Sequence, residues 1–251
     1  MERVAVIDLH CHLLPVVDDG PPTLAESIAM ARLAYDDGVR SVAVTPHSGG
    51  WLERYRGPEV AETMRSQVRA LEEALHQAGI ALTLYPGMEV DFDPDLPQQL
   101  LAGQVQPLGN GPYFLMELPA FQYSLHLEQT LFQVQLQGWR PVLAHVERYL
   151  YVQENPDLLA PLVQRGVVVQ ITARNLAGAA GPETREIARK LLRRGLVHVL
   201  ASDGHRARGA RLPLLAAGVT EAARIVGADR ARAMVTTVPQ RILEGKEIGE
   251  L

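Results

Sequence analysis

The sequence contains very little cysteine and very little lysine. Its 251 residues include a single cysteine, Cys11, which cannot form an internal disulfide and fits a reducing compartment. The two lysines are Lys190, in an expected helix, and Lys246, in the C-terminal tail. Because neither lysine follows an expected strand, none is placed for Schiff-base chemistry or for a carbamylated metal bridge.

A positive net charge and long apolar runs are also missing. The formal net charge is −5, so no overall positive field attracts nucleic acid. The longest apolar stretches fall far short of the ~20 residues that a membrane-spanning helix needs. The chain begins with a charged, strand-like segment instead of a signal peptide. We therefore expect a cytoplasmic protein that neither binds nucleic acid nor inserts into a membrane.

Short apolar runs alternate with helical patterns along most of the chain. Strand-like runs occur near residues 4–9, 40–45, 81–86, 112–117, 140–145, 167–171 and 197–202. Helical patterns occur at about 23–37, 58–78, 124–138, 156–165 and 183–194, with a last pair at about 213–226 and 228–245. Thr23 and Glu26 form a capping-box pattern at the first helix. The stretch 90–112 departs from the alternation and suggests a short helix and an irregular loop.

This alternation predicts parallel strands joined by right-handed crossovers. Hydrophobic residues make up 47% of the chain, which is enough to bury one large core. Seven such units close more naturally into a barrel than into an open sheet. We therefore expect the α/β class, a seven-stranded (β/α)7 barrel, and a single domain over residues 1–251.

Acidic and imidazole side chains recur at the ends of the apolar runs. They are His10, His12, Asp19, His47, Glu89, Glu117, His145, Asp203 and His205. Because the C-terminal ends of the strands converge on one face of an α/β barrel, these side chains are expected to meet there. A mixture of imidazole and carboxylate suits Mn, Fe or Zn, whereas Ca and Mg favour oxygen ligands alone. The pattern predicts a metalloenzyme with a cluster of divalent ions.

Each part of this pattern also has a simpler interpretation. His10 and His12 are two residues apart at a strand end, so both point to one side, but they can be ordinary loop histidines. Glu89 and Glu117 can be exposed caps, although an unpaired buried carboxylate would be costly. Cys11 is expected to be a small core residue. The other histidines are expected to be structural, and they are His76, His126 and His198.

Several segments together resemble a known superfamily. They are IDLHCHLLPVVDDG, VAVTPH, GMEV, AHVERY and ASDGH, and they resemble the polymerase and histidinol phosphatase (PHP) superfamily. Within it, they are most similar to the bacterial metal-dependent protein tyrosine phosphatases of capsule and exopolysaccharide clusters. The resemblance covers nearly the whole chain in the right order. It implies a distorted, TIM-like seven-stranded barrel that holds three metal ions, usually Mn²⁺.

The resemblance also implies an assignment of ligands. The first ion is held by His10, His12, Glu89 and Asp203, and Glu89 bridges to a second ion held by Glu117 and His145. The third ion is held by Asp19, His47 and His205. The choice of Asp19 over Asp18 depends only on the glycine that follows it directly.

Arginines near two of the metal motifs are expected to bind phosphate. Arg148 follows the HVE segment, and we expect it to act in catalysis together with Glu89 and Asp203, because a guanidinium matches phosphate geometry. A surface salt bridge is its alternative role. The RARGAR loop offers Arg206, Arg208 and Arg211 as further substrate-binding residues, and the sequence leaves the choice among them open.

The expected reaction is metal-assisted hydrolysis of a phosphomonoester. We expect a protein tyrosine phosphatase that acts on an autophosphorylated bacterial tyrosine kinase in capsule or exopolysaccharide regulation. The alternatives are a small-molecule PHP phosphatase, such as a histidinol phosphatase, and a noncatalytic regulatory protein that keeps a metal cluster. A metal-dependent amidohydrolase is disfavoured because no lysine follows an expected strand.

Overall fold

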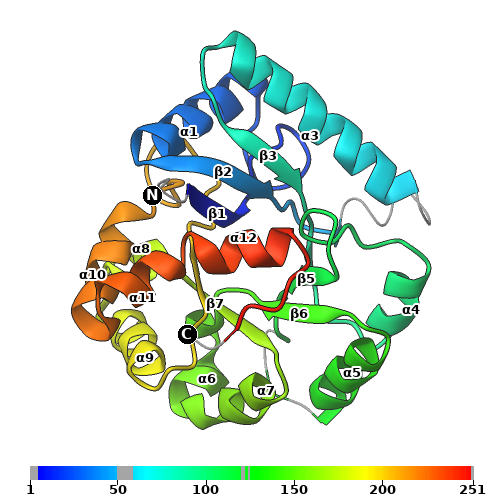
Figure 1. The fold of residues 1–251 in the computed structure, drawn as a ribbon, viewed down its shortest axis with the longest axis vertical. Coiled ribbons are helices and arrows are strands. Elements are labelled where there is room, and N and C mark those ends of the chain that lie inside the picture. The colour runs from blue at the N-terminus through cyan, green and yellow to red at the C-terminus, as the bar shows by residue number, and fades with distance from the viewer. Residues whose placement is uncertain (1–4, 50–58, 120–121, 124, 250–251) are drawn as a thin grey trace.

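The computed structural model describes residues 5–49, 59–119, 122–123 and 125–249 (Figure 1). Within these ranges, all strand pairs are parallel. One sheet contains β1 (Val6–Cys11), β2 (Val39–Val44) and β3 (Thr83–Pro86). The other contains β4 (Glu89–Val90), β5 (Tyr113–Met116), β6 (Arg140–Leu143), β7 (Val168–Thr172) and β8 (Val199–Ala201), in that order. The predicted α/β class with parallel strands is confirmed.

Helices cover the outer faces of both sheets (Figure 1). The small sheet carries α1 (Leu24–Asp36) and α3 (Glu59–Gln77), and the large sheet carries α5 (Leu125–Leu136), α7 (Ala160–Gln164) and α9 (Pro182–Arg193). Shorter or later helices are α4 (Leu96–Leu101), α6 (Leu150–Glu154), α8 (Ala173–Leu176), α10 (Ala216–Val226), α11 (Ala228–Ala233) and α12 (Thr237–Leu243), with 3-10 turns at Val146–Arg148 and Pro156–Leu159. No helix in the described ranges is long and apolar enough to cross a membrane.

The apolar core has an outer and an inner part. The outer part lies between the sheets and the helices. The inner part is formed by alternate strand residues that face one another, among them Ile7, Leu9, Ala43, Leu115, Val142, Val168, Val199 and Ala201. Val238, Ile242 and Leu243 of α12 pack against this inner part. Because Val235, just before α12, accepts a hydrogen bond from Ile7 at the start of β1, α12 lies at the N-terminal ends of the strands. The opposite end is left for a functional site.

The expected strand at 81–86 is present as β3, and a separate two-residue strand, β4, follows it in the other sheet. Gly87 and Met88 separate β3 from β4, and the chain changes sheet at this point. A side chain at Gly87 would meet Leu108 and Thr45, each 3.0 Å from the added Cβ, so any larger residue would have to displace these two side chains slightly. Immediately after the change of sheet, Glu89 forms an isolated parallel bridge with His47. The change of sheet therefore places Glu89 at the seam between the two sheets.

A second bridge, between Cys11 and Gly204, joins the other edges of the sheets. The single closed seven-stranded barrel that the sequence predicts is not confirmed, because the described residues form eight strands in two sheets. The expected last helix at 228–245 is also divided, since α11 ends at Ala233 and α12 begins at Thr237. The break occurs at Thr236, whose backbone (φ −133°, ψ −86°) is not helical.

Of the two hydrogen bonds expected in the capping box of the first helix, one is present. The Thr23 hydroxyl accepts a hydrogen bond from the Glu26 amide at 3.2 Å. The Glu26 carboxylate instead accepts the Ala207 amide at 2.9 Å. Glu26 thus fixes the RARGAR loop, which lies beside the functional site described next.

Candidate metal centre

The acidic and imidazole residues singled out in the sequence meet at the C-terminal ends of the strands. Within the described ranges, their ligand atoms form three groups, each with all atoms within 4.8 Å of one another. The groups are His10, His12 and Glu89; Glu89, Glu117 and His145; and His12, Asp19, His47 and His205. Two residues are shared, because Glu89 belongs to the first and second groups and His12 to the first and third. The three groups therefore form one continuous cluster.

Glu89 lies at the centre of this cluster. Its side chain is fully buried, and its Oε2 lies 3.1 Å from Nε2 of His10, 3.1 Å from Nε2 of His12 and 3.3 Å from Nδ1 of His47. Its Oε1 lies 2.9 Å from Nε2 of His145. Oε2 is nevertheless buried without a well-formed hydrogen bond. A carboxylate oxygen that faces several imidazole nitrogens in this way is an arrangement that suits a shared cation.

Asp203 lies beside the first group, and Glu117 belongs to the second. Oδ1 of Asp203 lies 3.5 Å from Nε2 of His10 and 3.7 Å from Nε2 of His12. Oε1 of Glu117 lies 3.1 Å from Nε2 of His145. Glu89 is buried and the Glu117 side chain is one-quarter exposed, so neither is a freely exposed cap.

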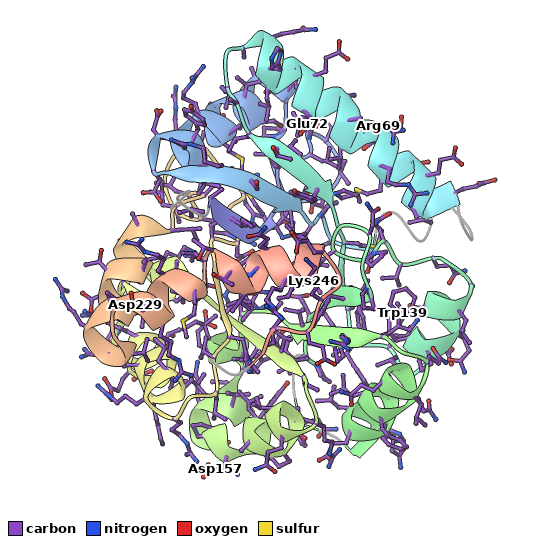
Figure 2. The ribbon with its side chains drawn as sticks, viewed as in Figure 1. Arg69, Glu72, Trp139, Asp157, Asp229 and Lys246 are labelled. Atoms are coloured by element: carbon purple, nitrogen blue, oxygen red, sulfur yellow. The ribbon has the colours of Figure 1, made fainter. Side chains whose placement is uncertain are left out.

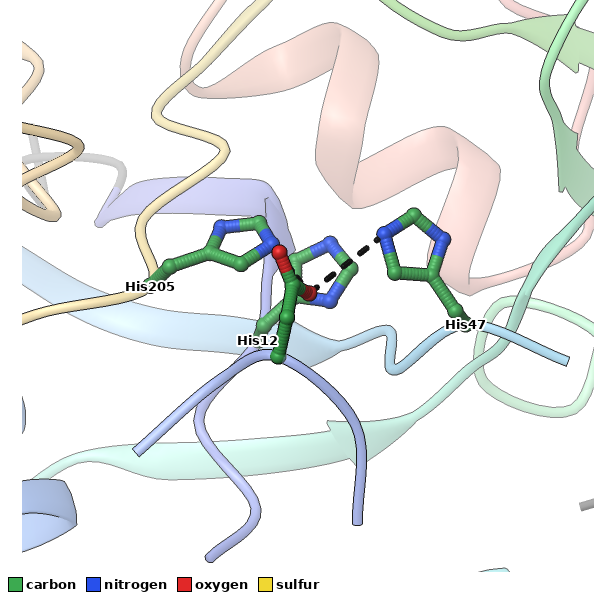
Figure 3. A group of neighbouring side chains, drawn as sticks. His12, His47 and His205 are labelled. Carbon is green, nitrogen blue, oxygen red and sulfur yellow. Dashed lines mark ion pairs between the residues drawn. The ribbon is translucent and has the colours of Figure 1, made fainter. Parts of the chain in front are cut away.

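The third group is the more open part of the cluster. His12, His47 and His205 point toward one another (Figure 3). Oδ1 of Asp19 lies 3.1 Å from Nε2 of His205 and 3.6 Å from Nε2 of His47. The Asp19 side chain is 53% exposed, whereas His12 and His205 are buried. Solvent and substrate can therefore reach the cluster from this side.

Asp18 and Asp19 have different surroundings although they are adjacent. The Asp18 carboxylate lies 2.6 Å from Nδ1 of His12 and accepts the amides of Gly20 (2.8 Å) and His47 (2.9 Å). A Cβ at Gly20 would lie only 2.8 Å from Oδ1 of Asp18, so the loop closes only around glycine. Asp18 orients His12 and His47 from behind, and Asp19 presents its oxygen to the cluster.

Strained backbone is concentrated at this site. In the described ranges, the non-glycine residues with positive φ are Val16 (63°), His145 (33°), Asp203 (51°) and Arg211 (62°). Non-glycine residues rarely adopt such backbone angles, and the resulting strain costs about 1–3 kcal/mol for each residue. Three of the four place a side chain in or beside the cluster. Val16 lies in the loop that leads to Asp18 and Asp19.

The carboxylates create a strongly negative field in which positive charge is stabilised. Burial alone would lower the pKa of His12, but Asp18 and Glu89 raise it to about 10. Burial would likewise lower the pKa of His145, which Glu117 and Glu89 raise to about 9. Burial would raise the pKa of Glu89, yet the charge of His10 and the hydrogen bonds of the neighbouring imidazoles hold it well below its usual value. Divalent cations would be stabilised by the same field.

Arg148 lies at the inner edge of the cluster. Its Nη2 forms an ion pair with Oδ2 of Asp203 and lies 3.5 Å from Oγ1 of Thr172. The side chain is 29% exposed, so it is not fully enclosed by the cluster. Arg148 thus forms a salt bridge with a nearby carboxylate, as in the alternative role expected from the sequence, but this carboxylate is buried and belongs to the cluster.

The three arginines of the RARGAR loop have different positions. Arg211 reaches the cluster, with Nη1 2.9 Å from Oδ2 of Asp19 and Nη2 3.5 Å from Oδ1 of Asp203. The Arg208 side chain is exposed and contacts no other described residue through a hydrogen bond or ion pair. Arg206 donates to the main-chain carbonyls of Asp19, Gly20 and His205. Arg206 therefore braces the loops, and Arg211 is the arginine that faces the cluster.

Buried residues outside the predicted set hold the cluster in place. Oε1 of Gln170 accepts the His145 amide at 3.0 Å and lies 3.2 Å from Nδ1 of His10. Asp8 accepts the amide and the hydroxyl of Ser202, at 2.9 and 2.5 Å. Gln170 and Asp8 are not among the site residues predicted from the sequence. Each is a polar residue within an apolar strand, in VVVQIT and AVIDLH. A polar residue in such a strand indicates a buried group that needs a partner, and this is the feature of the sequence that points to both residues.

The remaining histidines and the cysteine lie outside the cluster. His76 and His126 are exposed on α3 and α5. His198 accepts the Val169 amide at 3.0 Å and has a structural role. Cys11 is buried, and burial raises the pKa of its thiol well above the usual value, so it is a core residue and not a nucleophile.

Comparison with known proteins extends these observations. Residues 6–244 match the protein family described as "Capsular polysaccharide synthesis, CpsB/CapC". The chain is 36% identical over 200 residues to the tyrosine-protein phosphatase YwqE of Bacillus subtilis (strain 168), which covers 80% of this chain and 77% of YwqE. It is 28% identical over 243 residues to the tyrosine-protein phosphatase CpsB of Streptococcus pneumoniae, which covers 95% of this chain and 98% of CpsB.

Solved structures show the same similarity. One structure comes from work on YwqE from Bacillus subtilis and CpsB from Streptococcus pneumoniae, described there as unique metal-dependent tyrosine phosphatases. It superposes with a TM-score of 0.89 at 32% identity, over 98% of this chain and 97% of that chain. A D-hydantoinase superposes with a TM-score of 0.56 at 11% identity, which shows a likeness of fold alone.

Proposed function

This chain belongs to the CpsB/CapC family of capsular polysaccharide synthesis proteins, and from that premise we propose that it is a metal-dependent protein tyrosine phosphatase. The observation that supports the proposal most directly is the set of three ligand groups that share Glu89 and His12. Family membership without these groups would leave the activity open. A cluster of this kind in a chain with this ancestry supports phosphomonoester hydrolysis.

We propose that the cluster holds three divalent ions, with Mn²⁺ as the preferred metal and Fe or Zn as substitutes. The first ion would be held by His10, His12, Glu89 and Asp203. The second ion would be held by Glu117 and His145, together with Glu89, which would bind both ions. Asp19, His47 and His205 would hold the third. The residues fit this role because Oε2 of Glu89 is buried without a well-formed hydrogen bond and faces imidazole nitrogens at 3.1–3.3 Å. The mixed nitrogen and oxygen donors suit these metals better than Ca or Mg.

Bound divalent ions supply positive charge to phosphoryl oxygens and lower the pKa of bound water. In this proposal, Arg148 and Arg211 bind the phosphoryl group, because both guanidiniums lie beside Asp203. Their paired donors match phosphate oxygens and stabilise the charge that develops on them. The tyrosine phenolate has a pKa of only ~10, so it leaves with less help from a general acid than an aliphatic alkoxide needs.

The proposed substrate is phosphotyrosine in another protein. The relatives are named tyrosine-protein phosphatases, and the family is described by capsular polysaccharide synthesis. We therefore propose that the substrate of this chain is the phosphorylated tail of a bacterial tyrosine kinase that controls capsule or exopolysaccharide assembly. The exposed Asp19 side of the cluster fits a substrate that is attached to a larger protein.

We also propose that residues 1–251 form one domain built on a distorted barrel.

Histidinol phosphatase activity is the main alternative. Its substrate carries a cationic amine and an imidazole, which Arg148 and Arg211 at the cluster would repel. The test compares kcat/KM for a phosphotyrosine peptide, a phosphoserine peptide and histidinol phosphate, using the Mn²⁺-loaded chain. We expect the phosphotyrosine peptide to be preferred by at least about tenfold, the scale of ~1.4 kcal/mol.

Two variants control for contaminating phosphatases in this comparison. Glu89→Gln should lose the activity, whereas Glu73→Gln, an identical change on the exposed face of α3, should keep it. Histidinol phosphate as the best substrate would overturn the tyrosine phosphatase assignment. Equal activity in the Glu89→Gln variant would show that the hydrolysis does not come from this site.

A further inference from the structure

Arg174 lies beside the metal centre but has no place in the function described so far. It is in the first turn of α8, which follows directly after β7. The last residue of β7 is Thr172, whose hydroxyl lies 3.5 Å from Nη2 of Arg148. The neighbouring Asn175 is buried and donates to Glu147 at 2.7 Å, which fixes this turn next to the HVER segment. Arg174 itself is half-buried.

The guanidinium of Arg174 has no partner among the residues that the structure describes. Its Nε is buried without a hydrogen bond, and no described carboxylate lies within ion-pair distance. Burial removes part of the hydration of a charge, and a partner normally compensates for that loss. Arg189 and Arg230 also have a buried Nε without a hydrogen bond, but Arg174 is the one next to the HVER segment. Arg148 and Arg211, by contrast, both pair with Asp203.

Charges of both signs act on Arg174, and the positive ones have the larger effect. Arg148 and Arg211 are both near enough for their charges to act on it, and Asp203 and Glu147 offset them only in part. Burial, followed by the charge of Arg148, lowers the pKa of Arg174 from its usual value. An anion from outside the chain would relieve this repulsion and supply the missing hydrogen-bond acceptor.

The anion that fits Arg174 is not the phosphoryl group itself. Arg148 and Arg211 contact Asp203, a candidate metal ligand, and so lie where a phosphoryl group at the cluster would bind. Arg174 forms no hydrogen bond or ion pair with the described candidate ligands. We propose that Arg174 binds a carboxylate side chain next to the phosphotyrosine, so that the enzyme prefers substrates with acidic flanking residues. This inference rests on the proposed tyrosine phosphatase function and names a specificity determinant for it.

The experiment uses two phosphotyrosine peptides that differ only in their flanking residues, Glu in one and Gln in the other. Values of kcat/KM are measured with the full Mn²⁺-loaded chain for the wild type, Arg174→Gln, Arg174→Glu and Arg69→Gln. Arg69 is exposed on α3 (Figure 2), so its substitution removes the same charge at a distance from the site. Dissociation constants of the matching phosphonate peptides, which cannot be hydrolysed, give a second readout.

We expect the wild type and Arg69→Gln to prefer the Glu peptide by about fivefold, the scale of a favourable partly exposed ion pair. Arg174→Gln should reduce this ratio to about one, and Arg174→Glu should reverse it, in both kcat/KM and phosphonate binding. An unchanged ratio in Arg174→Gln would overturn the inference. An equal fall for both peptides would assign Arg174 to the phosphoryl group or to folding, and would also overturn it. If the wild type hydrolyses neither peptide, the proposed function itself fails, and this inference fails with it.

Discussion

Replacing Asp18 and Asp19 one at a time should separate a supporting residue from a metal ligand. Asp18→Ala removes two amide hydrogen bonds, at 2.8 and 2.9 Å, and a 2.6 Å contact with the His12 ring. At ~1 kcal/mol for each amide and ~1.5–3 for the charged contact, the free energy of unfolding should fall by about 3–5 kcal/mol. Asp19 is 53% exposed and pairs with Arg211 at the surface, so Asp19→Ala should cost about 1 kcal/mol or less.

Both substitutions should nevertheless weaken metal binding. Asp19→Ala removes a ligand oxygen, and Asp18→Ala removes the acceptor that orients His12, a change that typically lowers metal affinity by ~10–100-fold. Urea unfolding of the chelator-treated chains measures the free energy of unfolding, and calorimetric titration with Mn²⁺ measures the affinity for the metal. Asp95→Ala serves as the control, because Asp95 is exposed and makes no side-chain cap bond to α4. Equal stability losses for Asp18→Ala and Asp19→Ala, or wild-type Mn²⁺ affinity in both, would refute this division of roles.

Three further predictions concern single residues. Arg148→Lys keeps the charge but loses the forked donor, so turnover of a phosphotyrosine peptide should fall at least ~10-fold; wild-type kinetics would remove Arg148 from the site. Val16→Gly relieves the positive φ of a β-branched residue, so urea unfolding should show a gain of about 1 kcal/mol, and a loss would contradict the strain argument. His198 has its pKa lowered by burial from 6.5 to about 4, so the unfolded chain binds its proton more tightly and stability should fall as the pH drops from 6.5 to 4, by up to ~3 kcal/mol. His198→Asn, which keeps an acceptor for the Val169 amide, should lack this component, and an identical pH profile would contradict the assignment.

Much of the fold and the membership of the cluster could be predicted from the sequence. The alternation of apolar runs and helical patterns predicts parallel strands. The spacing of the apolar residues in each segment indicates whether the segment is a strand or a helix and which of its faces is buried. Ligand-type residues at successive strand ends must meet if the strands are parallel, which is why His10, His47 and His145 converge without any similarity in local sequence. The helix that follows Thr23 begins where its capping residue predicts.

Features that depend on contacts between distant segments could not be predicted in this way. Asp18 and Asp19 are adjacent acidic residues, and the contacts of Asp18 with the His12 ring and with the His47 amide, 29 residues away, are what distinguish them. The change of sheet that places Glu89 at the seam depends on how closely Leu108 and Thr45 approach Gly87. Arg174 belongs to no motif, and its position beside Arg148 follows from how α8 packs after β7.

We propose that this cluster binds several divalent ions and that these ions activate phosphotyrosine hydrolysis. The most direct test adds Mn²⁺ stepwise to the chelator-treated chain and records, at each step, the ions bound per chain and the rate of hydrolysis of a phosphotyrosine peptide. We predict that two to three ions bind per chain and that activity appears only after more than one has bound. Fewer than two bound ions, or hydrolysis that is independent of added metal, would contradict the account.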